Sequence, residues 1–381
     1  MHIAIVRKAY SLKKAGAERY CVNLTRHLQA LGQQVTIIGE TIDPELRDEV
    51  EFVPVKVTHT TSWAKNRSFA DNAARAVAQR RFDVVHGLSR TPAVDCFRVT
   101  DPLQAHWFQV YYRNPWARWI QRFNPRHRML FSLEQSIYQA PWVRRIITQS
   151  RLDSQLVSEY YGVPPDKIRR VYNGVDTRVF HPGVRADAAA VREELRLEPD
   201  TPLLVFASMD FRRKGLGPVL QALALSQHRE ARLVVVGNGQ CDLYAALAAK
   251  LGIGGRVLFA GRRTDIQRFY GAGDLFVLPT LYEPFPNVNL EAMACGLPVL
   301  TSATAGGADI INEGQNGYCV TDGQSVAELT ERIDRHLALP AVDRARMAAC
   351  CWETAREMTL EKNARQTLAV LEEAALEKSR V

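Results

Sequence analysis

The sequence contains no long hydrophobic segment. Its longest apolar runs, such as IAIV, LVVV and LFVL, have the length of strands, and none approaches the ~18 apolar residues that a membrane-spanning helix requires. The opening residues, MHIAIVRKAY, lack the apolar region of a secretory signal. These absences predict a cytoplasmic protein that does not cross a membrane.

Several metal-binding and redox patterns are also missing. The seven cysteines are scattered and lack the spacing of a zinc site, which favours reduced thiols in the cytoplasm. No two of the nineteen aspartates stand two positions apart, so no DxD-type pair is available to hold a divalent metal on a nucleotide diphosphate. The loop after the first strand, KKAGAERY, is not the GxGxxG fingerprint of a hydride-transfer enzyme. We expect neither a bound metal nor a cofactor.

What the sequence does contain is a regular alternation of strand-sized apolar runs and helical stretches. One series starts with HIAIV and continues through QVTIIG, FDVVHG, CFRVTD and RRIITQS; a second runs from TPLLVFAS through LVVVGNG, GRVLFAG, GDLFVLP and LPVLTS. Buried strands that alternate with helices form parallel sheets, and 381 residues suffice for two such domains. The predicted fold class is therefore α/β, with two Rossmann-like doubly wound domains facing a cleft. We expect the first at 1–178, the second at 179–355, and a last helix at 356–381 that packs back on the first.

The chain is basic, with a formal net charge of +8, which predicts an anionic partner. Residues 102–133 contain no acidic side chain, while five arginines are interspersed there with Trp107, Trp116, Trp119 and Phe123. Basic residues beside interfacial aromatics are typical of a surface that lies on anionic lipid. A nucleic-acid surface, or a helix that buries its aromatics in the core, would have a similar composition. We favour a membrane surface at 106–128 and expect no nucleic-acid partner, because nothing there matches a nucleic-acid motif.

The segment EPFPNVNLEAMACG places two carboxylates, Glu283 and Glu291, around the start of a predicted helix. Pro286 has no N–H, but the first position of a helix does not need one. The amides of the first turn then point toward an anion: those of Asn287, Val288 and Asn289. The two carboxylates would accept hydrogen bonds from sugar hydroxyls on either side of that anion. On spacing alone, it is equally consistent that Glu291 only favours the helix start electrostatically and that Glu283 is solvated.

Other loops that follow strands carry polar residues. FASMDFRRKGLG places Arg212, Arg213 and Lys214 after a strand, where they would neutralise a diphosphate; a solvated basic turn is the alternative. Asp101 and His86 each follow a strand-like run, so either could contact a reacting hydroxyl, although a single such residue at a strand end is more often structural.

Together these segments resemble the retaining glycosyltransferases of the GT4 family, which have the GT-B fold. EPFPNVNLEAMACGLPV is similar to the family's double-glutamate motif, VYNGVDTRVF to its hinge signature, and GRRTDIQRFYGAGDLFVLPT to its nucleotide-side segment. AGAER resembles the N-terminal glycine loop with Ala15 in place of the first glycine, and FRRKG the basic phosphate loop with Met209 where an arginine usually follows the strand. Within the family, TPAVDCFRVTD, RHRMLFSLEQSIY and SMDFRRKG are most similar to the lipopolysaccharide-core α-1,3-glucosyltransferases of the heptose glucosyltransferase I type.

The resemblance implies roles for individual residues. Asp101 would lie at the reaction centre, Lys214 at the diphosphate and Glu283 at the donor sugar. The remaining donor-binding positions would be Gly16 by the phosphates, Arg212 or Arg213 at the diphosphate, Arg262 near uracil, Pro286, Asn287 and Val288 at the helix start, and Glu291 at the ribose.

The activity implied by the resemblance is metal-independent transfer of a hexose, with retention, from a UDP-sugar to a lipid-linked saccharide. Glucose is the expected hexose, and the heptose of the lipopolysaccharide core is the expected acceptor, on the cytoplasmic face of the inner membrane. Two alternatives stay open: a UDP-sugar 2-epimerase or hydrolase on the same fold, and a non-catalytic protein that binds membrane or nucleic acid.

Overall fold

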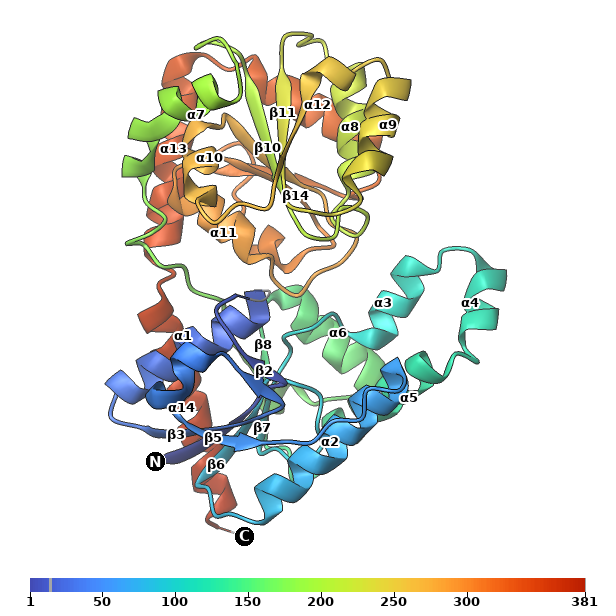
Figure 1. The fold of residues 1–381 in the computed structure, drawn as a ribbon, viewed down its shortest axis with the longest axis vertical. Helices are drawn as coiled ribbons and strands as arrows, with labels where there is room; N and C mark the ends of the chain where they lie inside the picture. The colour runs from blue at the N-terminus through green and yellow to red at the C-terminus, as the bar shows by residue number, and fades with distance from the viewer. Residues whose placement is uncertain (14–15, 381) are drawn as a thin grey trace. The chain divides into compact units, whose positions relative to one another are not determined.

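The computed structural model describes residues 1–13 and 16–380, which divide into two compact units (Figure 1). Unit 1 comprises Met1–Asn173 with Leu360–Val381, and unit 2 comprises Gly174–Thr359. The division after Asn173 has a local cause. The buried guanidinium of Arg98 donates to the Asn173 side chain at 2.8 Å within unit 1, whereas Val175 N donates to Met358 O at 2.9 Å within unit 2.

Unit 1 is built on a seven-stranded sheet with the order β5-β3-β1-β6-β7-β8-β9, in which all described strand pairs are parallel. The strands are β1 His2–Val6, β3 Gln34–Gly39, β5 Glu51–Pro54, β6 Val84–Gly87, β7 Cys96–Arg98, β8 Arg145–Thr148 and β9 Ile168–Arg170. A separate short pair joins β2 Ala9–Tyr10 to β4 Thr41–Ile42. The central strands are almost wholly apolar and buried, as expected for a parallel sheet covered on both faces.

The helices of unit 1 connect and cover these strands. They are α1 Gly16–Ala30, α2 Ser62–Ala78, α3 Gln104–Tyr111, α4 Pro115–Gln121, α5 Pro125–Tyr138, α6 Arg151–Tyr161 and α14 Leu360–Lys378, with short 3₁₀ turns η1 Pro44–Glu49 and η2 Pro165–Lys167. Figure 1 shows α3 and α4 extending away from the sheet of unit 1. Among the described helices, none is both long and apolar enough to cross a membrane.

The last helix, α14, packs on unit 1. Its side chains Ala364, Val370 and Leu371 are part of the same hydrophobic core as the strands of the seven-stranded sheet. Arg145 on β8 forms an ion pair with Glu373 at 2.9 Å, which ties the polar side of the helix to the sheet. The chain therefore returns to its first unit at the end, but the last helix begins at Leu360 and not at 356, where the sequence placed its start.

Unit 2 has a six-stranded parallel sheet with the order β12-β11-β10-β13-β14-β15. The strands are β10 Leu203–Ala207, β11 Arg232–Val236, β12 Val257–Gly261, β13 Leu275–Leu278, β14 Val299–Ser302 and β15 Gly317–Val320. The helices are α7 Ala188–Glu194, α8 Leu216–Leu225, α9 Cys241–Lys250, α10 Ile266–Ala272, α11 Asn287–Ala294, α12 Val326–Leu337 and α13 Ala341–Arg356, with 3₁₀ turns η3 Pro182–Asp187, η4 Gly254–Arg256 and η5 Gly306–Ile310. The predicted α/β class with two Rossmann-like sheets is confirmed.

Each sheet has a point where the direction of strand addition reverses. In unit 1 this switch lies between β1 and β6, because β3 and β5 extend the sheet on one side and β6 to β9 on the other. In unit 2 it lies between β10 and β13. Ligands of open α/β sheets bind at the carboxyl ends of the strands beside such a switch, so the loops after these four strands define the candidate sites.

Candidate functional site

The loop after β10 turns sharply so that Lys214 comes back over the carboxyl end of the sheet. Asp210 organises the turn, because its carboxylate accepts from Arg213 N at 3.1 Å and its carbonyl from Lys214 N at 3.1 Å. Gly215 then adopts a left-handed φ of +83°, and an added Cβ would lie 2.3 Å from the carbonyl oxygen of Pro279. Glycine is therefore required where this loop passes close to the end of β13.

Lys214 meets Glu283 at this switch point. The buried ammonium of Lys214 contacts a carboxylate oxygen of Glu283, and Nη1 of Arg213 lies 3.5 Å from the same oxygen. Burial lowers the pKa of the Lys214 ammonium well below its ordinary value, Arg213 lowers it further and Asp210 raises it. The direct contact with Glu283 favours the charged ammonium, so the structure gathers two cations around one carboxylate.

The loop that carries Glu283 is fixed from two sides. Thr280 lies three residues before Glu283. Its hydroxyl donates to Arg213 O at 3.1 Å, and its backbone carbonyl accepts from Ser302 Oγ at 2.7 Å. The carbonyl of Glu283 accepts from Gly306 N at 2.9 Å, which extends the anchoring to the loop after β14. Contacts with the loop after β10, with the end of β14 and with the loop after it thus fix the backbone that carries Glu283.

Helix α11 begins at Asn287, so the buried Pro286 lies directly before the helix and not at its first position, where the sequence placed it. The first N–H groups of a helix have no acceptor within it, and Val288 lies in this first turn. The expectation for Asn289 is wrong: its amide donates to Pro286 O at 3.0 Å, because the chain closes a tight turn there, and its side chain is fully buried and donates to Thr301. Of the three amides that the sequence assigned to an anion, that of Val288 lies in the first turn and remains a candidate.

The other residues of unit 2 that the sequence assigned to the donor lie in the segments that follow β10, β12 and β13. Glu291 lies one turn into α11 and is half-buried. Arg212 is exposed beside the buried Lys214, so Arg213 is the arginine that the described contacts place at Glu283. Arg262 is exposed directly after β12.

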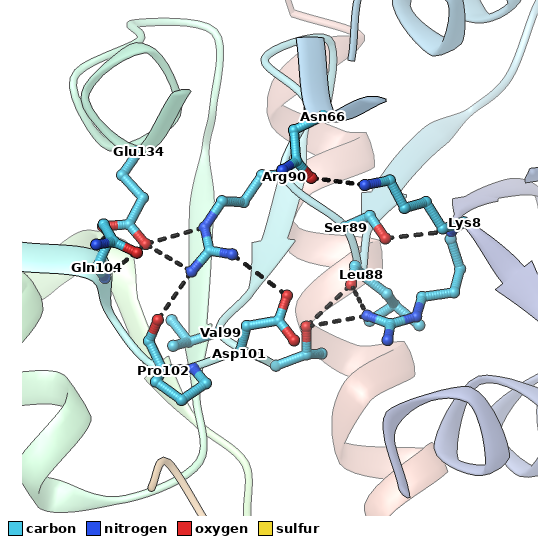
Figure 2. A network of polar contacts seen from close by, with 12 residues as sticks. Lys8, Asn66, Leu88, Ser89, Arg90, Val99, Asp101, Pro102, Gln104 and Glu134 are labelled. Carbon is cyan, nitrogen blue, oxygen red and sulfur yellow. Dashed lines mark hydrogen bonds and ion pairs between the residues drawn. The ribbon is translucent and has the colours of Figure 1, made fainter. Parts of the chain in front are cut away.

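Unit 1 has its own polar network at the switch point between β1 and β6 (Figure 2). Figure 2 shows Arg90 at its centre, pointing toward Asp101, Glu134 and the carbonyl of Pro102. Glu134 is buried and lies 2.8 Å from Nη2 of Arg90, while Asp101 is 43% exposed and 3.4 Å from Nη1. Arg90 thus holds one side of the Asp101 carboxylate, and the other side is exposed to solvent.

A pocket of about 90 Å³ borders Asp101. It is lined by Arg7, Lys8, Glu18, Asn66, Phe69, Ser89, Arg90 and Asp101. Sequence reasoning did not single out the three cations in this lining. Their positions in the sequence could have indicated the pocket, because Arg7 and Lys8 directly follow β1 and Arg90 comes soon after β6.

Two other expectations in unit 1 have different outcomes. His86 is fully buried within β6, and its Nδ1 lies 3.3 Å from Cys96 O; burial lowers its pKa to about 3, so it is a neutral core residue outside the pocket. Gly16 is exposed at the first position of α1. Ala15, compared above with a glycine of the N-terminal loop, lies outside the described residues.

The basic and aromatic segment projects its aromatic side chains to the surface. Helix α4 buries none of its residues, and Trp116 and Phe123 are 76% and 64% exposed. The alternative that this helix buries its aromatics in the core is therefore wrong. α4 ends at Gln121, so Phe123 lies beyond it, but its ring still packs on Trp119 with centroids 5.3 Å apart.

No cluster of three or more metal-ligating side chains occurs in the part of the chain that the structure describes.

Two family models match the chain. Residues 15–179 match the model described as Glycosyltransferase Family 4, and residues 187–357 match that described as Glycosyl transferases group 1. The second match spans the Lys214 and Glu283 centre, and the first spans the pocket beside Asp101 except for Arg7 and Lys8.

Two curated relatives cover most of the chain. Spore coat protein SA of Bacillus subtilis (strain 168) is 26% identical over 342 residues, which are 84% of this chain and 85% of the relative. Lipopolysaccharide glucosyltransferase WaaG of Escherichia coli (strain K12) is 23% identical over 329 residues, which are 84% of this chain and 86% of the relative.

Solved structures show the same fold. The crystal structure of WaaG, described as a glycosyltransferase involved in lipopolysaccharide biosynthesis, has a TM-score of 0.84 and 22% identity over 97% of this chain and 99% of its own. Anabaena Alr3699/HepE in complex with UDP-glucose has a TM-score of 0.72 and 18% identity, with all of both chains covered. The chain therefore belongs to the GT4-type glycosyltransferases of the GT-B fold.

Proposed function

We propose that the protein transfers a hexose, glucose by preference, from a UDP-sugar to a lipid-linked saccharide with retention of configuration. The observation that carries the proposal is the contact of Lys214 with Glu283 at the switch point of unit 2, beside the start of α11. A nucleotide sugar presents an anionic diphosphate between two sets of hydroxyls, and this centre offers cations, helix amides and two carboxylates. The structure of HepE with UDP-glucose supports the choice of donor, because a protein of the same fold binds that ligand.

In this proposal the bond between the anomeric carbon and the β-phosphate oxygen breaks, and UDP leaves. The acceptor hydroxyl forms the new bond to the anomeric carbon on the same face, and its proton passes to the departing phosphate oxygen. Lys214, Arg213 and the first turn of α11 stabilise the charge that develops on the diphosphate. A divalent ion would not be required, which predicts that activity survives treatment with a chelator. Glu283 holds hydroxyls of the donor sugar, Glu291 the ribose, and Arg262 lies near uracil.

Asp101 is proposed to bind the accepting hydroxyl in unit 1. Its carboxylate is held on one side by Arg90 and is 43% exposed, so it can orient the acceptor without being free to swing away. Gly16, exposed at the start of α1, would let the donor phosphates approach the helix start. These assignments follow the family resemblance, residue by residue.

The proposed acceptor is the heptose of the lipopolysaccharide core. The similarity to WaaG over most of both chains supports this choice, because that relative is named as a lipopolysaccharide glucosyltransferase. Such an acceptor is anchored in a membrane, and the exposed Trp116, Trp119 and Phe123 with the surrounding arginines suit an anionic lipid surface. We propose that residues 106–128 hold the enzyme on the cytoplasmic face of the inner membrane.

The test is incubation with a panel of UDP-sugars and extracted core lipid, read by mass spectrometry. A mass increase of one hexose on the lipid with UDP-glucose, and release of UDP, would support the proposal. Consumption of UDP-sugar without any acceptor would favour the 2-epimerase or hydrolase instead. Failure to bind every UDP-sugar, with retained binding to vesicles, would favour a non-catalytic membrane protein.

A further inference from the structure

The pocket beside Asp101 has an unusual distribution of charge. Its lining contains three cationic side chains, Arg7, Lys8 and Arg90, and two carboxylates, Glu18 and Asp101. All five side chains gather at the switch point between β1 and β6, where open α/β sheets bind their ligands.

The two arginines of the pocket are already neutralised. Nη2 of Arg7 lies 2.7 Å from Glu18, and the buried guanidinium also donates to the carbonyl of Leu88 at 2.6 Å. Arg90 lies 2.8 Å from Glu134 and shares its remaining N–H groups with Pro102 O and Asp101. Because both guanidinium groups are paired with carboxylates and carbonyls, we expect them to attract an anionic ligand only weakly.

Lys8 differs from both arginines. Its ammonium donates to the neutral side-chain oxygen of Asn66 at 2.6 Å and lies 5.4 Å from the ring centroid of Phe69. No carboxylate of the described chain lies within ion-pair distance of it. A half-buried cation without an ion-pair partner is unfavourable, and an anionic ligand beside it would reduce this cost.

The pKa of Lys8 agrees with that geometry. Burial is the largest cause of its fall to about 8. The charged groups that face the ammonium act in both directions, with Lys65 and Arg7 lowering the pKa and Glu40 and Asp101 raising it. The two positive neighbours and the burial outweigh the two carboxylates.

We propose that this pocket binds an anionic substituent, a phosphate or a carboxylate, on the acceptor saccharide, and that Lys8 is the residue that selects it. The inference rests on the proposed function, because it assumes that unit 1 binds the acceptor. The volume of about 90 Å³ exceeds the ~10–15 Å³ that one water needs. It is well below the about 300 Å³ at which pockets begin to enclose a whole small molecule, so its size suits a substituent.

The chemistry of the lining suits either anion. Lysine is a compact charge with three donors, and charge-assisted hydrogen bonds to phosphate or carboxylate are among the strong ones. Ser89, whose Oγ accepts from the backbone N of Lys8 at 3.2 Å, places a hydroxyl beside the same space. With the substituent in the pocket, a neighbouring hydroxyl of the acceptor would reach Asp101 at the rim.

The first experiment titrates inorganic phosphate and acetate into the full-length wild type, Lys8→Met and Lys8→Arg, followed by calorimetry at pH 7. We expect at least one anion to bind the wild type, Lys8→Met to weaken that binding about tenfold or more, and Lys8→Arg to restore most of it. Lys56→Met is the matched control, since Lys56 is exposed on the same unit outside the pocket, and should bind as the wild type does. Absence of binding of both anions to the wild type, or equal binding to Lys8→Met, would overturn the proposal.

The second experiment measures transfer from UDP-glucose to three acceptors: a heptoside, its phosphate monoester and the corresponding uronic acid. We expect the anionic acceptor of the preferred class to have the lowest KM. In Lys8→Met the ratio of its KM to that of the neutral heptoside should rise about tenfold, while kcat for the anionic acceptor changes less than twofold. If the phosphate monoester has the lower KM of the two anionic acceptors, the natural substituent is a phosphate; if the uronic acid has the lower KM, it is a carboxylate.

The two proposals fail in different ways. If the wild type binds no UDP-sugar, the proposed function is wrong. If it transfers glucose to all three acceptors with the same KM, or if Lys8→Met raises the KM of all three equally, the activity stands and only the anionic selection is wrong.

Discussion

The ammonium of Lys214 contacts the carboxylate of Glu283 across the carboxyl ends of β10 and β13. The two residues come from loops separated by two further strands in the sequence, and they meet because β10 and β13 are neighbours in the sheet. At a switch point, the lysine and the glutamate of such a pair can each replace their mutual contact with a contact to a bound ligand. A diphosphate would attract the lysine, and the hydroxyls of a sugar would bind the glutamate.

Replacement of Lys214 by alanine should lower kcat strongly. Since removal of one preorganised group that stabilises developing charge typically costs ~10²–10³ in kcat, we expect a loss of that order in steady-state assays with UDP-glucose and core lipid. Lys250→Ala, at the exposed end of α9, is the control and should keep the wild-type rate. Activity of Lys214→Ala within about twofold of the wild type would refute the diphosphate role.

Replacement of Glu283 by alanine should impair the use of the donor sugar more than the binding of UDP. A hydrogen bond between a charged group and a ligand contributes about 1.5–3 kcal/mol, so kcat/KM for UDP-glucose should fall roughly 10-fold to 150-fold while the Kd of UDP changes little. Glu198→Ala, at an exposed position of unit 2, should leave both quantities unchanged. An equal loss in both measurements would mean that Glu283 does not bind the sugar.

Replacement of Gly215 by alanine should destabilise unit 2. Any L side chain at φ +83° costs ~1–2 kcal/mol, and here the new Cβ also meets the carbonyl oxygen of Pro279 at 2.3 Å. Gly252→Ala is a matched control, because Gly252 has a φ of +72° and no atom within 4 Å of an added Cβ. Thermal or denaturant unfolding should therefore show a larger loss for Gly215→Ala, and equal losses would show that the close approach to Pro279 does not matter.

Removal of the exposed aromatics should release the protein from anionic membranes. Trp116→Ser with Phe123→Ser deletes two side chains that would each contribute about 1.5–3 kcal/mol when buried in lipid, so partition onto vesicles with anionic lipid should fall at least about tenfold. The melting temperature should not change, because both side chains are exposed. Trp63→Ser removes an exposed tryptophan elsewhere, on α2, and should not alter vesicle binding; if it weakens binding as much, the surface is not specific to 106–128.

Lys8→Met should stabilise the unliganded protein near neutral pH. The pKa of Lys8 is about 8 in the folded protein, below its ordinary 10.5, so the unfolded chain binds more protons between these values and the wild type gains stability as the pH rises through them. The advantage of Lys8→Met in free energy of unfolding should therefore be largest below pH 8 and should shrink toward pH 10.5. Urea unfolding of both proteins from pH 7 to pH 10 tests this prediction. A difference in free energy of unfolding that does not vary with pH would contradict the lowered pKa of Lys8. A Lys8→Met variant less stable than the wild type at pH 7 would indicate a structural role for the lysine.

The sequence predicted the strands, the two parallel sheets and the loops of unit 2 that carry polar groups. These features depend on local patterns: apolar runs of strand length, a proline before a helix, and glycines at turns. Lys214 and Glu283 were identified as separate residues, but their contact was not, because it depends on the order of the strands. The same limit applies to Arg213, which could not be preferred over Arg212 until the loop geometry was known.

The pocket beside Asp101 was largely missed, with only Asp101 foreseen. Single cations after strands, such as Lys8 and Arg90, have no characteristic spacing. Their roles depend on partners far away in the sequence, such as Glu134 for Arg90. The amide of Asn289 was assigned wrongly for the opposite reason, since a tight local turn onto Pro286 O overrode the average geometry of a helix start.

The most direct measurement is a crystal structure of the full chain with UDP-glucose. The account predicts the diphosphate within hydrogen-bonding distance of Lys214 Nζ and of the first turn of α11, with the glucose hydroxyls on Glu283. Density for the nucleotide at another place on the protein, or no density at saturating concentration, would contradict it.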